Sequence, residues 1–577
     1  MISTEQFLLK QFPALPIASK RHKLLKFVFK RLLHEKEFID FAQRYPLLSG
    51  FDFVEKALEY FEFKIATTDS EIEHIPVTGR VVIIANHPIG SLDAFALLHT
   101  IRKLRPDVKV VANELLMSVP PLQDILLPVN NLTGNTLKRD LKNIHQFLDD
   151  EGALIIFPAG EVSRVTPQGI RDRAWEKGFL TFAERAKAPI LPIHIQARNS
   201  LTFYATSLFY KPLASLLLVK EMFKHNHTCI KLSIGKSIPY TSYGDSKIAN
   251  TLKIKLLQKQ LYRVAKRKES LFKTESAIAH PVNRVELKKS IEHCEQLGTT
   301  NDGKQIYLYQ SEQPSIILKE LGRLREFTFR SVGEGTGNKR DLDPFDHQYM
   351  HLILWDPEDL EIVGAYRFSP IQRLMKGSDS SGLYTDKLFN YQDEMLPYFE
   401  KGIELGRSFV QPRYWGKRSL DYLWQGIGAF LAQNPQYRYL LGPVTLSAAL
   451  PQRAQAFLVY FYQLYFPAQG DLAYGRDSYQ LSEELEDELW RFFSADDYAK
   501  DFAKLKTMLA NMGVSVPTLY KQYTELCEHG GVQFVDFNID PDFSNCIDGL
   551  VIVDVKYLKA KKRARYIDVH QRTLEKE

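Results

Sequence analysis

A histidine and an aspartate stand six positions apart where a predicted strand gives way to a predicted helix. The segment Asn86-His87-Pro88-Ile89-Gly90-Ser91-Leu92-Asp93 follows the apolar run 81–85 and precedes the helix-like stretch 94–104. A neutral imidazole whose second nitrogen donates to a carboxylate can take a proton from a hydroxyl group. The spacing therefore indicates His87 as a general base that Asp93 orients. The alternative is a hydrogen-bonded loop histidine beside a carboxylate in the first turn of a helix.

Two further apolar runs, 153–157 and 190–195, are typical of buried strands. The first runs into Phe157-Pro158-Ala159-Gly160-Glu161-Val162-Ser163-Arg164. Together with the histidine motif, this set resembles the glycerolipid acyltransferase superfamily over about residues 60 to 265. The resemblance implies an α/β fold in which His87 and Asp93 catalyse O-acyl transfer. It also implies that the acceptor contacts a group of residues in the third motif: Phe157, Pro158, Gly160, Glu161 and Arg164.

The motifs depart from the common family pattern at two places. Five residues separate the histidine from the aspartate, where four are common. Val162 stands where the family has an arginine that holds a glycerol phosphate, and the nearest guanidinium is that of Arg164. A planar guanidinium suits phosphate because it donates twice. Both variants resemble the branch of the superfamily that makes amino-acid lipids, whose acceptor carries no phosphate.

The second half of the chain places charged residues in apolar or turn contexts. Arg325 and Phe329 share one face of a predicted helix, 316–332, and Arg367 lies in a predicted hairpin of residues 349–355 and 361–368. Asp343 and Asp346 lie in the loop between helix and hairpin. For all of these except Phe329, a buried ion-pair network that stabilises the fold is the alternative interpretation.

A predicted strand, 404–410, alternates Glu404 and Gly406 on one side with Arg407 and Phe409 on the other. With the charged residues above, it resembles the acyl-homoserine-lactone synthases and the ornithine N-acyltransferases. That resemblance implies a GNAT-like fold and an acyl carrier protein as donor. The reaction needs a neutral amine aimed at a thioester, so Glu404 is the candidate base. Charge complementarity suggests Arg407 for an α-carboxylate and acidic side chains for the δ-ammonium of ornithine.

The patterns predict two domains of the α/β and α+β classes. A helical region, 1–60, precedes a glycerolipid acyltransferase-like α/β domain, 61–265. A charged linker, 266–300, then leads to a GNAT-like domain, 301–577. A chain of 577 residues is too long for one hydrophobic core, which agrees with this division.

Composition favours a soluble protein of a reducing compartment. Its four cysteines show no paired spacing, residues 1–6 do not resemble a signal peptide, and no apolar run approaches a membrane span. The net charge is +6, and cations travel with aliphatic residues in segments 20–33, 201–224 and 556–565. For segment 20–33, a core-facing helix with a solvated basic side is the alternative interpretation. The membrane interpretation predicts peripheral association with the inner face of the cell membrane from the cytoplasm. Nucleic-acid binding is not expected, because no recognised nucleic-acid-binding motif is present.

The two halves together resemble bifunctional ornithine-lipid synthases. The prediction is N-acylation of ornithine by the second half, from acyl carrier protein, followed by O-acylation of the lyso-lipid hydroxyl by the first. No metal or cofactor is required. Three alternatives remain: a lipid of glycine, serine or another amino acid, a lysophosphatidic acid acyltransferase with an accessory domain, and a membrane-binding protein that has lost activity.

Overall fold

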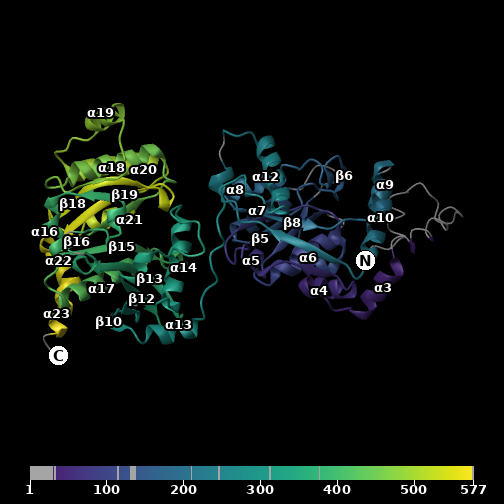
Figure 1. The fold of residues 1–577 in the computed structure, drawn as a ribbon, viewed down its shortest axis with the longest axis horizontal. Coiled ribbons are helices and arrows are strands. Elements are labelled where there is room, and N and C mark those ends of the chain that lie inside the picture. Colours follow the sequence, from purple (N-terminus) through teal and green to yellow (C-terminus); the bar gives the residue numbers. More distant parts are fainter. Residues whose placement is uncertain are drawn as a thin grey trace. The chain divides into compact units, whose positions relative to one another are not determined.

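The computed structural model describes residues 27, 30–31, 34–113, 116–129, 138–209, 211–244, 247–310, 313–375, 377 and 379–574. Most of the basic segment 20–33 therefore lies outside the described residues. The chain divides into two compact units, Met1–Ala277 and Ile278–Glu577 (Figure 1). No helix among the described residues combines the length and the apolar character needed to cross a bilayer.

Seven strands of the first unit form a mostly parallel sheet in the order β1-β9-β8-β2-β5-β3-β4. Only the β8–β9 pair is antiparallel in it. A separate small hairpin joins β6 and β7. The strands are β1 (Lys64–Ala66), β2 (Val81–Ala85), β3 (Lys109–Asn113), β4 (Leu126–Val129), β5 (Ala153–Ile156), β6 (Arg164–Thr166), β7 (Gly169–Arg171), β8 (Ile190–Gln196) and β9 (Cys229–Ile234).

Helices cover both faces of this sheet. Ile83 of β2 packs in a core with Leu97 of α6, and its neighbour Ile84 packs on the opposite face with Leu257 of α12. A strand buried on both faces must be apolar at every position, which explains the unbroken run 81–85. The helices are α3 (Glu35–Arg44), α4 (Gly50–Tyr60), α5 (Asp69–Ile72), α6 (Ser91–Arg102), α7 (Lys138–Asp149), α8 (Gly178–Ala186), α9 (Leu201–Phe209), α10 (Lys211–Lys224), α11 (Tyr240–Tyr243) and α12 (Asn250–Val264).

The second unit holds a sheet of eight described strands in the order β10-β11-β12-β13-β15-β16-β19-β18. All neighbours are antiparallel except β15 and β16. The strands of this unit are β10 (Glu295–Thr299), β11 (Gln305–Tyr309), β12 (Met350–Asp356), β13 (Glu361–Pro370), β14 (Phe389–Tyr391), β15 (Gly402–Val410), β16 (Tyr439–Leu446), β17 (Ala473–Gly475), β18 (Val532–Asp540) and β19 (Cys546–Asp554).

Helices α14 and α17 pack into different cores of the second unit. Leu324 of α14 packs with Ile353 of β12, and Leu423 of α17 packs with the preceding residue of that strand, Leu352. Because successive strand residues face opposite sides, the two helices cover opposite faces of the sheet. The helices are α13 (Arg284–Ile291), α14 (Ile316–Ser331), α15 (Ile371–Leu374), α16 (Leu396–Glu400), α17 (Ser419–Gln433), α18 (Gln452–Tyr465), α19 (Glu483–Phe492), α20 (Tyr498–Asn511), α21 (Thr518–Thr524), α22 (Ala560–Arg563) and α23 (Val569–Leu574).

The parallel pair β15 and β16 is short. It covers only the steps from Gly402 opposite Tyr439 to Glu404 opposite Leu441. Beyond Glu404 the two strands diverge, although both continue for several residues. Strands that separate in this way leave space between them, so the divergence of β15 and β16 forms a cavity in the second unit.

A bulge interrupts β15 just after this point. Gly406 pairs with Arg367 and Phe409 with Ala365, so Arg407 and Ser408 together face the single residue between them on β13. Arg407 has a φ of 47°. The extra residue brings Phe409 to the same face as Gly406. The predicted alternation, which set Phe409 opposite Gly406, is therefore wrong beyond the bulge.

The predicted linker, 266–300, is only partly a connection. Helix α13 packs against α14, and β10 pairs with β11 as the edge strand of the second sheet. Residues from Arg284 onward therefore belong to the second unit. The many charges of this segment did not indicate a helix or a strand of the second unit, because an edge strand and a surface helix both tolerate many charges.

Candidate active sites

The first candidate site lies at the carboxyl ends of the parallel strands β2, β5 and β8. His87 lies two residues after the end of β2, and Phe157 follows β5 directly. Asn86 ties the end of β2 to β8, since its side chain donates to the Ile195 carbonyl at 2.9 Å and accepts from the Ile195 N–H at 2.7 Å. Carboxyl ends of neighbouring parallel strands meet at one edge of a sheet, where open α/β folds place their ligands.

The structure brings His87 and Asp93 together. The imidazole Nδ1 lies 3.1 Å from Asp93 Oδ2, and the Asp93 side chain is fully buried while 20% of the His87 side chain is exposed. The same Oδ2 accepts the backbone N–H groups of Ile89 at 2.8 Å and Gly90 at 3.0 Å. These bonds fix the carboxylate, so it can hold the imidazole in one orientation while the ring stays accessible.

The loop after β5 forms the wall beside this histidine. The rings of Phe157 and His87 have centroids 4.2 Å apart. Gly160 closes the turn with a φ of 62°, and its N–H donates to the Phe157 carbonyl. Pro158 accepts a backbone hydrogen bond from Glu176. The loop is thereby rigid, and the aromatic face of Phe157 limits how the imidazole can turn.

A carboxylate that the motifs did not indicate also supports the histidine. Asp172 accepts the backbone N–H of His87 at 3.2 Å and the hydroxyl of Ser163 at 2.5 Å. Its other oxygen accepts from the Trp175 indole. Burial raises the pKa of Asp172 against these hydrogen bonds. Asp172 therefore joins the β2 and β5 loops, and no spacing in the sequence relates it to His87.

Arg164 is buried with unused donors. Its side chain is 5% exposed, its Nη2 lies 3.6 Å from Glu161 Oε2, and its guanidinium lies over the Phe203 ring at 5.4 Å. Among the described residues, its Nε and Nη1 have no hydrogen-bond partner. Val162, at the position of the expected phosphate-binding arginine, is buried against Phe203. A buried guanidinium with these donors available can bind an anionic group.

In the second unit, four of the predicted site residues form a buried network of ion pairs. Arg325 Nη2 lies 2.7 Å from Asp346 Oδ1. Arg367 Nη1 lies 2.5 Å from Asp343 and 3.2 Å from Asp346. Burial opposes ionisation, but the two guanidinium groups hold the pKa of Asp346 far below its usual value. This network fixes the loop between α14 and β12 to the sheet.

Glu404 is sealed from the cavity of this unit. It is 1% exposed and accepts hydrogen bonds from the Thr385 N–H at 2.8 Å, the Thr385 hydroxyl at 2.6 Å, the Tyr384 N–H at 3.3 Å and the Tyr349 hydroxyl. Burial raises its pKa, and the bonds from Thr385 and Tyr349 oppose that rise. Every lone pair of this carboxylate is engaged in the structure.

The second candidate site is a cavity of about 660 Å³ where β15 and β16 diverge. Phe329 and Arg407 line it, whereas Arg325, Asp343, Asp346, Arg367 and Glu404 do not. Arg407 pairs with Asp341 at 3.1 Å and donates to the Tyr384 hydroxyl at 3.0 Å. Arg407 thus lines the cavity while Asp341, Asp343 and Tyr384 hold its guanidinium.

Two carboxyl groups that the motifs did not indicate also line this cavity, Glu334 and Asp548. Asp548 is 2% exposed and accepts the Thr445 hydroxyl at 2.5 Å. Burial, with repulsion from Asp540, raises its pKa to about 7 against the Thr445 bond. Burial and the neighbouring Asp548 raise the pKa of Glu334 to about 8. Neither forms an ion pair with another described residue.

Comparison with known proteins identifies both units. A family described as Acyltransferase matches residues 14–269, and one described as Acetyltransferase (GNAT) domain matches residues 324–425. A glycine N(alpha)-acyltransferase of Bacteroides thetaiotaomicron is 30% identical over 309 residues, which cover 50% of this chain and 89% of that protein. A lyso-glycine lipid O-acyltransferase of the same organism is 33% identical over 241 residues, 40% of this chain and 88% of that protein.

The chain belongs to the amino-acid-lipid acyltransferases. An L-ornithine N(alpha)-acyltransferase of Brucella abortus is also similar, 30% identical over 142 residues that cover 24% of this chain and 47% of that protein. The predicted fold classes are confirmed: this acyltransferase joins an acyltransferase α/β unit to a GNAT-type unit. His87 lies in the first matched region, and Arg407 in the second.

Proposed function

We propose that the chain carries out both acylations of an amino-acid lipid, with ornithine as the amino acid. The GNAT-type unit transfers a 3-hydroxyacyl chain from acyl carrier protein to the α-amine. The first unit then acylates the 3-hydroxyl of the product. The observation that carries this proposal is the cavity in which Arg407, Glu334 and Asp548 face one space.

The charges of that cavity match an amino acid with two ammonium groups. In the proposal, Arg407 holds the α-carboxylate and Asp548 takes a proton from the α-ammonium, because its raised pKa of about 7 suits a general base. The amine attacks the thioester carbonyl, the C–S bond breaks, and the thiolate takes the second proton of the amine. Glu334 then ionises and pairs with the δ-ammonium, a cation that no described residue supplies to this half-buried carboxyl group.

Glu404 remains a predicted base of the same step. To take a proton it must first release one of its hydrogen bonds from Thr385, Tyr384 or Tyr349. Asp548 requires no such change, since it lines the cavity and uses one described hydrogen bond. The variants Asp548→Asn and Glu404→Gln separate the two assignments, because only the variant of the true base loses the limb of the pH profile on which N-acylation rises with pH.

Glycine is the second candidate acceptor. Relatives named as glycine N(alpha)-acyltransferases match half of this chain and about nine-tenths of their own length, whereas the ornithine relative above matches over 47% of its length. Glycine has no second ammonium, so one of the two cavity carboxyls is left without a cation. The neutral form of Glu334, favoured by a pKa of about 8, makes that arrangement tolerable at neutral pH.

For the second step, His87 takes the proton of the lyso-lipid hydroxyl while Asp93 holds its ring. The hydroxyl oxygen attacks the acyl thioester, the C–S bond breaks, and the imidazolium returns its proton to the thiolate. Arg164 holds the free carboxylate of the N-acyl amino acid, which engages the guanidinium N–H groups left without partners. This assignment gives Arg164 a role with an acceptor that carries no phosphate.

The substrates place the enzyme at a membrane surface in this proposal. A lyso-lipid is amphiphilic and enters most easily from a bilayer interface. Three hydrophobic side chains of the first unit are exposed and suit such an interface: Phe27 at 67%, Leu47 at 93% and Leu201 at 87%. Association is peripheral, with the inner face of the cell membrane.

Mass spectrometry of lipids tests the proposal. The full chain is expressed in a host without amino-acid lipids, beside His87→Ala, Asp548→Asn and Glu404→Gln. The wild type is expected to make a phosphorus-free diacyl lipid of ornithine, and His87→Ala only the mono-acylated form. A glycine headgroup would replace the proposed acceptor with the second candidate. Consumption of lysophosphatidic acid without any amino-acid lipid would overturn the function of the second unit.

A further inference from the structure

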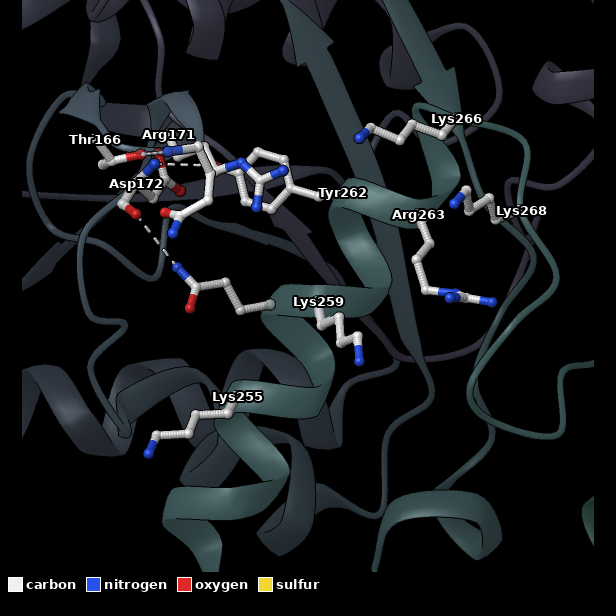
Figure 2. A pocket seen from close by; sticks show the side chains of 11 residues that line it. Thr166, Arg171, Asp172, Lys255, Lys259, Tyr262, Arg263, Lys266 and Lys268 are labelled. Carbon is white, nitrogen blue, oxygen red and sulfur yellow. Dashed lines mark hydrogen bonds between the residues drawn. The ribbon is translucent and has the colours of Figure 1, made fainter.

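A hollow in the first unit is lined by many cationic side chains and by a single acidic one. Its volume is about 390 Å³. Besides five other residues, six cationic side chains line it: Arg171, Lys255, Lys259, Arg263, Lys266 and Lys268. Figure 2 shows the cations of α12 along one helix and Arg171 on the hairpin opposite, against the Tyr262 ring. No lining residue is aliphatic.

These cations lack partners of opposite charge. Among the described residues, none of the six forms a salt bridge with a carboxylate. The one acid in the lining, Asp172, uses its oxygens for the His87 N–H, the Ser163 hydroxyl and the Trp175 indole. Like charges gathered in a hollow repel one another, so the site gains most when an anion enters.

The hollow lies beside the His87 site, because the two share Asp172. Asp172 lines it and accepts the backbone N–H of His87. Tyr262 lines it too, and its hydroxyl accepts the N–H of Asp172 at 2.8 Å. Gln258 donates to the Arg173 carbonyl at 2.8 Å. A ligand in the hollow is therefore next to the residues that position the histidine, as a part of the acyl donor must be.

Four of these cations form a row along the hollow. Lys255, Lys259 and Arg263 follow one another at intervals of four on α12, and Lys266 follows beyond its end. Neighbours at this spacing share one helix face, so the part of the row on the helix, from Lys255 to Arg263, extends for about 12 Å at about 1.5 Å per residue. The opposite face of α12 is apolar and buried, with Leu257 and Leu261 in the core. The helix is thus held rigidly with its cations outward.

We propose that this hollow and the cationic row of α12 are the donor site of the O-acyltransferase unit, where the phosphodiester of an acyl-phosphopantetheine arm and the acidic surface of its carrier protein bind. The assignment rests on the proposed function, because it takes acyl carrier protein as donor. Guanidinium and ammonium groups of the hollow bind the phosphodiester. The row on α12 pairs with carboxylates of the carrier, which steers its approach.

The polar lining distinguishes this site from a surface that binds lipid bilayers. An interfacial surface combines cations with large apolar side chains that enter the bilayer. In this hollow, Tyr262 is the only large ring, and Arg171 covers it at 4.7 Å. A soluble phosphate-bearing donor fits such a lining better than an anionic membrane does.

The test compares two charge reversals with the same spacing. Lys255→Glu/Lys259→Glu alters the row, and Lys138→Glu/Lys142→Glu alters two exposed lysines four apart on α7, outside the hollow. O-acylation of supplied lyso-lipid is measured with three acyl donors: acyl carrier protein, coenzyme A and pantetheine without phosphate. Carbodiimide cross-linking of the full chain to the carrier protein, read by peptide mass spectrometry, locates the contact independently.

The row variant is expected to raise KM for the carrier-protein donor by about tenfold or more, with kcat little changed and a weaker salt dependence. The α7 variant should behave as the wild type, and so should the row variant with acyl-pantetheine. Cross-links are expected at Lys255 and Lys259. An equal rise in KM for acyl-coenzyme A would identify phosphate as the main ligand, and no rise would identify the carrier surface.

If O-acylation proceeds with unchanged KM values and no cross-links form, the proposed donor site is wrong. Loss of binding to phosphatidylglycerol vesicles in the row variant alone, with unchanged KM in detergent, would assign the cations to the membrane instead. If no donor supports O-acylation but the cross-links form, the proposed O-acylation by the first unit is wrong, whereas carrier-protein binding at α12 is supported. The outcomes for the two proposals are therefore distinguishable.

Discussion

The substitution Asp548→Asn tests the cavity of the GNAT-type unit through both rate and stability. Asparagine has the shape of aspartate and its carbonyl can still accept the Thr445 hydroxyl, which lies 2.5 Å from Asp548 Oδ1. The change removes the ability to take a proton. We expect N-acylation to fall by about 10² to 10⁴, the usual contribution of a general base. The limb of the kcat/KM profile that rises near pH 7 in the wild type should disappear.

The same substitution should stabilise the fold at high pH. The pKa of Asp548 is raised from 3.8 to about 7 in the folded protein, so the folded state binds the proton more tightly than the unfolded state. This carboxyl group therefore does not lower the free energy of unfolding below its unfolded pKa. It lowers that free energy by the full amount above its folded pKa. At about 1.4 kcal/mol per pH unit, the penalty is about 2 kcal/mol near pH 5.5 and about 4 kcal/mol above pH 8.

Urea unfolding near pH 5.5 and pH 8.5 measures this difference. Tryptophan fluorescence reports mainly on the second unit, because only Trp175 lies outside it. The gain in unfolding free energy of Asp548→Asn over the wild type should be about 2 kcal/mol larger at the higher pH. An equal gain at both pH values, or a variant that keeps the wild-type pH profile of N-acylation, would refute the assignment of Asp548.

Three other substitutions probe the two units. Asp93→Asn should lower O-acylation by about 10² to 10⁴ without altering N-acylation, because the ring of His87 loses its orienting charge; lipid mass spectrometry measures both products. Arg367→Met should cost about 3 to 5 kcal/mol in urea unfolding, because Asp346 stays buried with one ion pair fewer. Gly442→Ala should lower the free energy of unfolding by about 1 to 3 kcal/mol, since its Cβ would lie 1.9 Å from the Leu405 carbonyl oxygen. The control is Gly406→Ala, whose Cβ would have no neighbouring atom within 4 Å.

Elements with a strict hydrophobic period could be predicted closely. The predicted helix 316–332 is α14, Ile316–Ser331, and the hairpin predicted at 349–355 and 361–368 is formed by β12 and β13. Apolar residues at helical or alternating spacing form one face that must be buried, and the spacing within the segment is enough to identify that face. The bulge at Arg407 could not be predicted in this way, because an extra residue is recognised only from the register with the partner strand.

The cavity carboxyls illustrate what the sequence could not supply. Asp548 stands in an otherwise apolar run, 546–553, and its distance in sequence from Arg407 gives no reason to pair them. They meet because β19 lies beside β16, and β16 diverges from β15. A lone carboxylate in a buried strand was the one available signal. Glu404 had a family motif in its favour, but its burial depends on the Tyr349 and Thr385 hydroxyls, which lie on distant segments.

The histidine site could be predicted for a topological reason, and the structure also explains its unusual spacing. Parallel strands bring their carboxyl ends to one edge wherever the chain goes next, so a strand-end histidine needs no further partner to be placed. The extra residue before Asp93 does not carry the carboxylate away. Gly90 adopts a φ of 93°, helix α6 begins at Ser91, and Asp93 turns back to accept the Ile89 and Gly90 N–H groups. A side chain at position 90 would oppose that φ, so the longer spacing depends on this glycine.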